Sequence, residues 1–295
     1  RRGLWRIFRK SPAIFKMIRA QARAKDDTPM SLGQVLEETA RRHPYRPALK
    51  WETGQLTYAQ MNARVNRTAH CLAGLGVKKG DAVAVMMANR PEALIVVAAL
   101  AKLGAVASMI NAQQRHRTLV HSLTCVATKR FIIGEELLEP FEEVRGELGE
   151  LPEGALLWVA DHEDGRPPEG WTDLIDARAD CSVANPSTVA NVKLGDPAFY
   201  IFTSGTTGLP KASIMSYKRW VGAGYMFGQV CLSLGPQDTL YAPLPLFHNQ
   251  ALTLSWSSAM LSGAALALRR KFTVSGFWDD CRRHEATAFA YIGEI

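Results

Sequence analysis

The chain has 295 residues, of which 47% are hydrophobic, enough for one large domain or two smaller ones. Its formal net charge is +7, but the first 25 residues hold nine basic residues and no acidic one. The other residues include 26 basic and 28 acidic ones and are nearly neutral together, which argues against a nucleic-acid-binding fold. The five cysteines include no C-x-x-C pair, which argues against a zinc site or a disulfide framework and favours a reducing, cytoplasmic compartment.

Residues 1–25 are predicted to form a basic amphipathic arm. Apolar side chains recur at steps of three and four among the cations, which is typical of an amphipathic helix. Such a segment can make peripheral contact with an anionic membrane, here its cytoplasmic face. A helix docked on the protein's own body and a flexible basic tail are the alternatives. The arm has no uninterrupted apolar core or cleavage site, so it is not a signal peptide.

Residues 26–295 are predicted to form one partial domain in which short apolar strands alternate with amphipathic helices. A capping box at Ser31 opens the first helix, and a second helix begins at Tyr58. The elements expected after them are a strand at 82–87, a helix at 91–103, a strand at 105–110, a helix at 117–125, a strand at 130–133, a helix at 135–148 and a strand at 155–159.

A stretch rich in Pro, Gly, Asp and Asn, residues 161–197, is expected to be an irregular excursion. Alternation then resumes with strands at 198–202, 239–241, 264–268 and 287–291 and helices at 218–234, 250–261 and 275–284. This order predicts an α/β fold whose mostly parallel sheet is covered by helices on both faces. The long apolar stretches 93–110 and 251–268 are interpreted as buried elements of this domain, and Trp220 and Trp278 as core residues.

The stretch YIFTSGTTGLPK, residues 200–211, places hydroxyls, glycines and a lysine directly after a predicted strand. Glycines let the backbone approach a ligand, hydroxyl and N–H groups donate hydrogen bonds, and the lysine adds a cation, which together suit a polyphosphate. The spacing excludes a Walker A loop, and Phe202 stands where a G-x-S-x-G nucleophile site needs glycine. The predicted phosphate-binding residues are Thr203, Ser204, Gly205, Thr206, Thr207, Gly208 and Lys211.

This stretch resembles the phosphate-binding signature of the adenylate-forming enzymes, which include acyl-CoA synthetases, luciferases and peptide-synthetase adenylation domains. Three other segments resemble motifs of that family in the expected order: LTYAQMN (56–62), LAKLGAVASMIN (100–111) and PLPLFHNQAL (243–252). Residues 269–295 are most similar to fatty-acid transport proteins and very-long-chain acyl-CoA synthetases. The resemblance implies the large N-terminal domain of the adenylate-forming fold, with stacked, mostly parallel sheets between helices and without the small C-terminal domain.

The resemblance implies a fatty acid–CoA ligase that works in two half-reactions. A fatty acid and ATP give acyl-AMP and pyrophosphate, and the sulfur of CoA then displaces AMP. Adenylation gathers negative charge on the phosphates, which Lys211, Thr206 and their neighbours would offset while Mg²⁺ bridges the phosphates. The resemblance also places His248 near the acyl-adenylate junction and Phe247 along the acyl tunnel. Tyr217 departs from the family, in which many members carry a histidine.

Two alternatives stay open. The protein could be a CoA ligase for another carboxylate, such as a bile acid, a carnitine-like acid or an aryl acid, or a membrane-associated fatty-acid uptake protein without catalysis. The family's adenine-binding, ribose-binding and C-terminal lysine motifs would fall beyond residue 295, so the chain is expected to be an inactive piece of a longer protein. The sequence determines neither the acyl chain length nor the oligomeric state.

Overall fold

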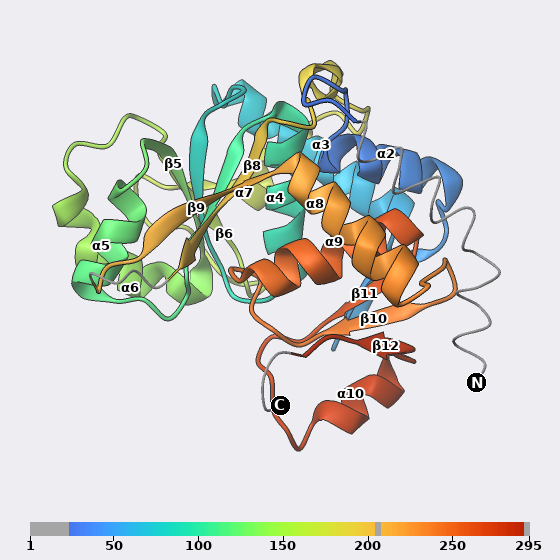
Figure 1. Ribbon diagram of the computed structural model, residues 1–295. Coiled ribbons are helices and arrows are strands. Elements are labelled where there is room, and N and C mark those ends of the chain that lie inside the picture. The colour runs from blue at the N-terminus through green and yellow to red at the C-terminus, as the bar shows by residue number, and fades with distance from the viewer. Residues whose placement is uncertain (1–23, 204–207, 292–295) are drawn as a thin grey trace.

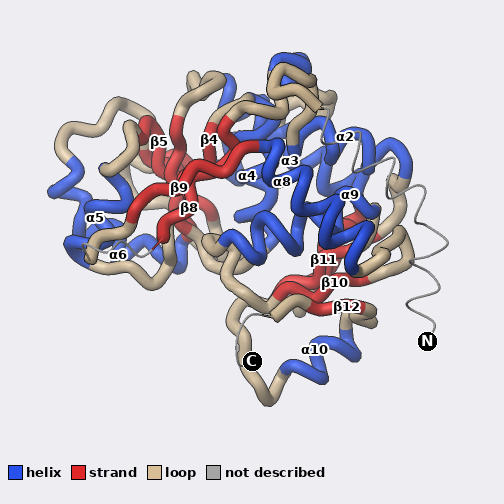
Figure 2. Tube along the Cα trace, in the orientation of Figure 1, coloured by secondary structure: helices blue, strands red, loops and turns tan. Residues whose placement is uncertain are grey.

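The computed structural model describes residues 24–203 and 208–291, which form an α/β domain with two β-sheets (Figures 1 and 2). The seven-stranded sheet has the order β7 (Thr172–Asp173), β6 (Leu156–Val159), β5 (Thr128–Gly134), β3 (Ala82–Met86), β4 (Val106–Met109), β8 (Pro197–Thr203), β9 (Lys211–Ser216). The five-stranded sheet has the order β12 (Ala288–Phe289), β10 (Thr239–Ala242), β11 (Ala265–Leu268), β1 (Pro47–Trp51), β2 (Gly54–Thr57). Strand pairs in both sheets are parallel except β8–β9 and β1–β2, so the predicted architecture is confirmed.

Helices fill the space between the two sheets and cover their outer faces (Figure 1). The inner helices are α2 (Leu32–Arg42), α3 (Tyr58–Gly74), α4 (Pro91–Leu103), α8 (Tyr217–Ala223) and α9 (Trp256–Ser262). The outer face of the seven-stranded sheet carries α5 (His116–Thr124) and α6 (Leu138–Arg145), and α10 (Phe277–Arg283) lies beside the five-stranded sheet. The short helix α7 (Leu174–Ala177) packs against β6 and α3.

Helix α4 lies at the centre of this layered packing. Its sequence, PEALIVVAALAKL, has no polar face, and every residue from Ala93 to Leu103 is buried. It contacts α3 on one side and strands β3 and β4 on the other, and Gly104 ends it in the left-handed conformation, with φ of 72°. The stretch 93–110 is therefore a buried helix followed by a strand, as predicted. No helix within the described residues is long and apolar enough to cross a membrane.

Several predicted elements differ from the observed ones. Strand β9 was not expected, because its hydroxyl-rich sequence alternates weakly, yet it pairs with β8 along its whole length. The helix expected at 218–234 divides into α8 and the wider π-helix η4 (Gly224–Cys231), and the helix expected at 250–261 divides into the π-helix η5 (Gln250–Ser255) and α9. Trp220 is buried as predicted. Trp278 is 64% exposed on α10, so its assignment to the core was wrong.

One of the contacts that hold the excursion at 161–197 against the inner helices is made by the buried cation of Lys102. The Nζ atom of this fully buried side chain lies 2.7 Å from Glu37 Oε1 on α2, and 2.8 and 2.7 Å from the amide oxygens of Asn62 and Asn66 on α3. It also lies 3.2 Å from Asn185 Oδ1 in the excursion. Burial lowers the pKa of Lys102 to about 8, and the neighbouring carboxylate opposes that shift. The motif residue Lys102 therefore has a structural role.

The substitution Lys102→Met is expected to lower the free energy of unfolding by about 3 kcal/mol or more, because it leaves a carboxylate and three amide oxygens without their cation. The matched control is Lys79→Met. Lys79 lies 2.7 Å from Asp196 but its side chain is 43% exposed, so the loss there should be within about 1 kcal/mol. Urea denaturation measures the free energy of unfolding of both variants. Equal losses would show that the buried Lys102 cluster stabilises the fold no more than the exposed Lys79 ion pair does.

Candidate active site

The predicted phosphate-binding loop connects the two strands of the β8–β9 hairpin. Thr203 and Lys211 are opposite each other in the register, so the hairpin brings the two ends of the loop together. Strands β3, β4 and β8 run parallel, which places the loop at the carboxyl edge of the seven-stranded sheet. Ligands of open α/β sheets bind at that edge. Residues Ser204, Gly205, Thr206 and Thr207 lie outside the described residues.

The described residues of this loop are open to solvent. Thr203, Gly208 and Lys211 are all exposed. Gly208 has φ of +84°, a conformation that favours glycine, and no described atom lies within 4 Å of the position that a Cβ would occupy there. The space beside Gly208 is therefore open among the described residues.

Tyr217 and His121 lie next to the two ends of the hairpin. Tyr217 stands beyond the opposite end of the hairpin, where Ser216 pairs with Pro197, and it is fully buried, with no partner for its hydroxyl among the described residues. Tyr217 is therefore a core residue, placed away from the loop. His121, on α5, was not predicted: its Nε2 atom lies 2.9 Å from the carbonyl oxygen of Pro210.

The second predicted site segment, the turn after β10, is fixed by Asn89. The Asn89 side chain accepts a hydrogen bond from Leu246 N at 2.8 Å and donates to the carbonyl oxygens of Leu244 at 2.9 Å and Arg269 at 3.3 Å. Asn89 follows β3. Strand β4 lies between β3 and β8, so β3 and β8 are about 10 Å apart at typical strand spacing. One buried amide therefore sets the turn that carries His248 against the sheet that carries the phosphate loop.

His248 lies on the surface of this turn, and Phe247 lies beneath it. The two ring centroids are 4.5 Å apart; Phe247 is buried, whereas His248 is exposed. The His248 backbone N–H donates to Pro245 O at 3.0 Å, which tightens the turn. Desolvation by the surrounding protein lowers the pKa of His248, which favours the neutral form of the imidazole. A neutral imidazole can donate from one nitrogen and accept at the other.

Two π-helices follow the hairpin and the turn. Helix η5 begins two residues after His248, and η4 packs closely on α9: a Cβ added at Gly224 would lie 2.7 Å from Ser257 O, and one at Gly228 would lie 2.8 Å from Ser258 Cα. Buried atoms of η5, Gln250 Oε1 and Thr253 Oγ1, have no hydrogen-bond partner among the described residues. Wide helical turns of this kind often mark functional sites, and η5 begins three residues after Phe247, which the family resemblance places along the acyl tunnel.

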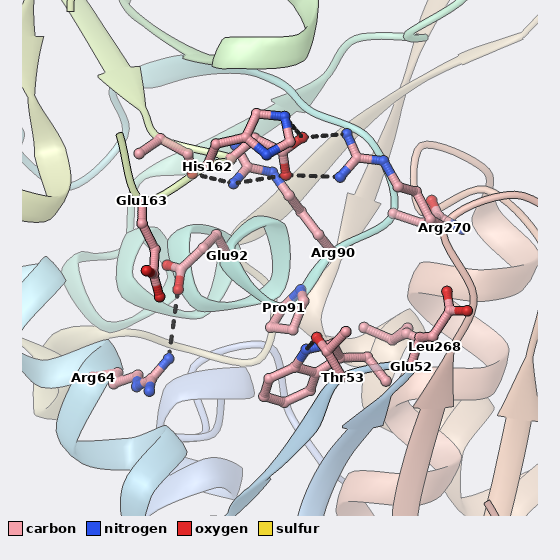
Figure 3. Close-up of a pocket in the computed structure, with 14 residues that line it drawn as sticks. Glu52, Thr53, Arg64, Arg90, Pro91, Glu92, His162, Glu163, Leu268 and Arg270 are labelled. Atoms are coloured by element: carbon pink, nitrogen blue, oxygen red, sulfur yellow. Dashed lines mark hydrogen bonds and ion pairs between the residues drawn. The ribbon is translucent and has the colours of Figure 1, made fainter. Parts of the chain in front are cut away.

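A cavity of about 590 Å³ opens between the carboxyl edges of the two sheets (Figure 3). At its upper side in this view, Arg270 from the five-stranded sheet makes a bidentate ion pair with Asp161 after β6, at 2.7 and 2.6 Å. Arg90 donates to the carbonyl oxygen of Val159 at 2.9 Å beside it. The Arg270 guanidinium lowers the pKa of the Asp161 carboxyl. These paired charges join the two sheets, and no sequence motif predicted them.

The two predicted site segments follow strands of different sheets, β8 and β10, and the turn after β10 is linked to the seven-stranded sheet through Asn89 after β3. One offers exposed backbone, a hydroxyl and a lysine for an anionic group. The other offers an imidazole above a buried aromatic ring, next to two wide helical turns with unpaired polar atoms.

Curated relatives of the chain include fatty-acid-activating and transport proteins. Medium/long-chain-fatty-acid–CoA ligase FadD6 of Mycobacterium tuberculosis is 40% identical over 290 residues, which cover 98% of this chain and 46% of that protein. Long-chain fatty acid transport protein 2 of Rattus norvegicus is 35% identical over 266 residues, which cover 88% of this chain and 42% of that protein. The chain therefore spans less than half the length of these relatives.

Solved structures share the fold. The anthranilate CoA ligase AuaEII in complex with anthranoyl-AMP superposes with a TM-score of 0.80 at 22% identity, over 91% of this chain and 50% of that chain. The N-terminal domain of FACL13 from Mycobacterium tuberculosis superposes with a TM-score of 0.75 at 27% identity, over 88% of this chain and 62% of that chain. The profile of the AMP-binding enzyme family matches residues 36–295. The chain therefore belongs to the AMP-binding enzymes, the adenylate-forming family.

Proposed function

We propose that the complete gene product is an ATP-dependent fatty acid–CoA ligase, which forms acyl-AMP and then the CoA thioester. The observation that carries this proposal is the glycine- and hydroxyl-rich hairpin loop that ends in Lys211, at the sheet edge where AMP-binding enzymes are expected to hold nucleotide. The choice of a fatty acid is supported by relatives named as a medium/long-chain-fatty-acid–CoA ligase and a long-chain fatty acid transport protein.

In the first half-reaction a carboxylate oxygen attacks the α-phosphorus of ATP, and pyrophosphate leaves. Negative charge then grows on the leaving phosphates. The proposed role of Thr203, Thr206 and the other loop residues is to donate hydrogen bonds to these oxygens, and that of Lys211 is to place a cation beside them. Because Lys211 starts a paired strand, its backbone is fixed while its exposed side chain can follow the phosphates.

The acyl group is proposed to lie along the turn after β10. His248 would approach the acyl-phosphate junction as a neutral hydrogen-bonding group, since partial desolvation lowers its pKa. Phe247 and the buried residues of η5 and α9 would form the apolar wall for the chain. In the second half-reaction the CoA sulfur attacks the acyl carbon, and AMP leaves.

Mg²⁺ is proposed to accompany ATP. Among residues 24–203 and 208–291, no three His, Cys, Asp or Glu side chains gather into a metal site. Mg²⁺ commonly keeps several waters and binds through substrate phosphates with one or two protein groups. The hydroxyl-rich loop is compatible with such a bound ion. The ion would neutralise part of the charge that builds on the phosphates during adenylation.

The substitution Lys211→Ala should reduce fatty-acid-dependent ATP–pyrophosphate exchange by about a hundredfold or more, because it removes the cation that offsets the leaving phosphates. The matched control is Lys218→Ala. Lys218 is an exposed lysine on α8 whose Nζ atom lies 2.9 Å from Asp26 Oδ1. The exchange rate of this variant should match the wild type. Exchange at the wild-type rate in Lys211→Ala would contradict the assigned role, and a wild-type gene product without any exchange would contradict the proposed reaction.

We also propose that residues 1–25 hold the protein peripherally on the cytoplasmic face of a membrane. The support is their composition: nine basic residues, no acidic one and apolar residues at helical spacing. Residues 1–23 lie outside the described residues. The chain joins the described fold at Ala24, which packs against the core, and at Asp26, which pairs with Lys218.

Deletion of residues 1–23 should weaken sedimentation with vesicles that contain anionic phosphatidylglycerol and leave the weaker binding to phosphatidylcholine vesicles unchanged. The deletion keeps Ala24, so the core contact is preserved. Wild-type binding should itself fall as salt rises from 0.1 to 0.5 M, because exposed charges are screened. If deletion leaves binding to anionic vesicles intact, the arm is not the membrane anchor.

A further inference from the structure

The carboxyl-terminal limb of the phosphate loop, residues 208–211, is hydrogen-bonded to helix α5 on the outer face of the sheet. The imidazole of His121, in the last turn of α5, places Nε2 at 2.9 Å from the carbonyl oxygen of Pro210. A carbonyl oxygen only accepts hydrogen bonds, so Nε2 carries the proton. The two residues are 89 positions apart in the sequence, and the contact is partly buried.

The point of contact is the last residue before the paired strand. Pro210 has no backbone N–H, so it cannot donate to the hairpin ladder, and the register between the strands ends at Thr203 and Lys211. Beyond this point, at Gly208, the backbone enters the left-handed region. The carbonyl of Pro210 is therefore held from outside the hairpin, directly where the chain leaves the ladder and becomes the loop.

We infer that His121 is a positioning residue for the phosphate loop, an inference that rests on the proposed function. The hydrogen bond fixes the peptide unit that joins Pro210 to Lys211, and so fixes the backbone from which the lysine side chain extends. A backbone that is already held in place loses less conformational freedom when the lysine that it carries engages a polyphosphate. His121 would thus favour ATP binding without touching ATP.

The chain offers a matched control for this contact. His70, on α3, places its Nε2 at 2.9 Å from the carbonyl oxygen of Ala184, in the excursion at 161–197. The chemistry and the distance are the same, but the carbonyl belongs to a segment that is not part of the phosphate loop. The His70 contact is exposed and the His121 contact is partly buried, so His70→Phe controls for the loss of a histidine–carbonyl hydrogen bond as such.

The test compares four variants of the complete gene product: His121→Phe, His121→Gln, His121→Asn and His70→Phe. Phenylalanine removes the donor, glutamine can place an amide N–H near the position of Nε2, and asparagine is too short to do so. The KM for ATP in pyrophosphate exchange should rise about three- to tenfold in His121→Phe and His121→Asn, the size expected from one lost hydrogen bond. It should stay near the wild-type value in His121→Gln and His70→Phe, and the KM for the fatty acid should stay unchanged in all four.

A second readout does not depend on activity. Trypsin cleaves after exposed lysines, and Lys211 follows the contact directly. Cleavage after Lys211 should be faster in His121→Phe than in His70→Phe or the wild type. The inference is overturned if the two phenylalanine variants behave alike in both assays, or if His121→Gln fails to restore the KM. If the wild type shows no exchange, the proposed function fails, and the cleavage rates alone still decide whether His121 orders the limb.

Discussion

The packing of helix α4 between the two sheets is the constraint on which the rest of the domain depends. Its eleven residues from Ala93 to Leu103 are buried, so the helix cannot shift without opening the core on both sides. Each end of the helix also carries a polar anchor. Asn89 holds the turn after β10, Arg90 holds the segment after β6, and Lys102 gathers α2, α3 and the excursion. One apolar element therefore sets the positions of segments far apart in the sequence.

This arrangement explains how two loops that follow strands of different sheets are held in a fixed relative position. The phosphate loop follows β8 of the larger sheet, whereas the His248 turn follows β10 of the smaller one. The amide of Asn89 crosses between the sheets, and so does the ion pair of Asp161 with Arg270. Both links lie at carboxyl ends of parallel strands, where side chains are free of the ladder and can reach across. The relative position of the two sheets is thus fixed at the same edge that holds the candidate site.

Charge is distributed unevenly between the arm and the folded part. The arm carries the excess of basic residues, whereas charges that link distant parts of the described fold are paired, as in Asp161 with Arg270 and Glu37 with Lys102. Lys211 differs from these, since its side chain is exposed at the site. A nearly neutral body with an exposed lysine at a glycine-rich loop suits recognition of one anionic group better than broad attraction to polyanions.

The sequence by itself determined the α/β class, most strands and helices and the family, because these follow from local apolar patterns and contiguous motifs. It placed Tyr217 and Lys102 in motifs without revealing that both are buried, and it missed β9, whose pairing with β8 depends on a partner strand. Only the tertiary structure decided the roles of Asn89, His121 and Asp161, since each acts on residues many positions away. Two expected α-helices are in part π-helices, and in η4 the close approach of Gly224 and Gly228 to α9 is a tertiary contact that the local sequence does not reveal.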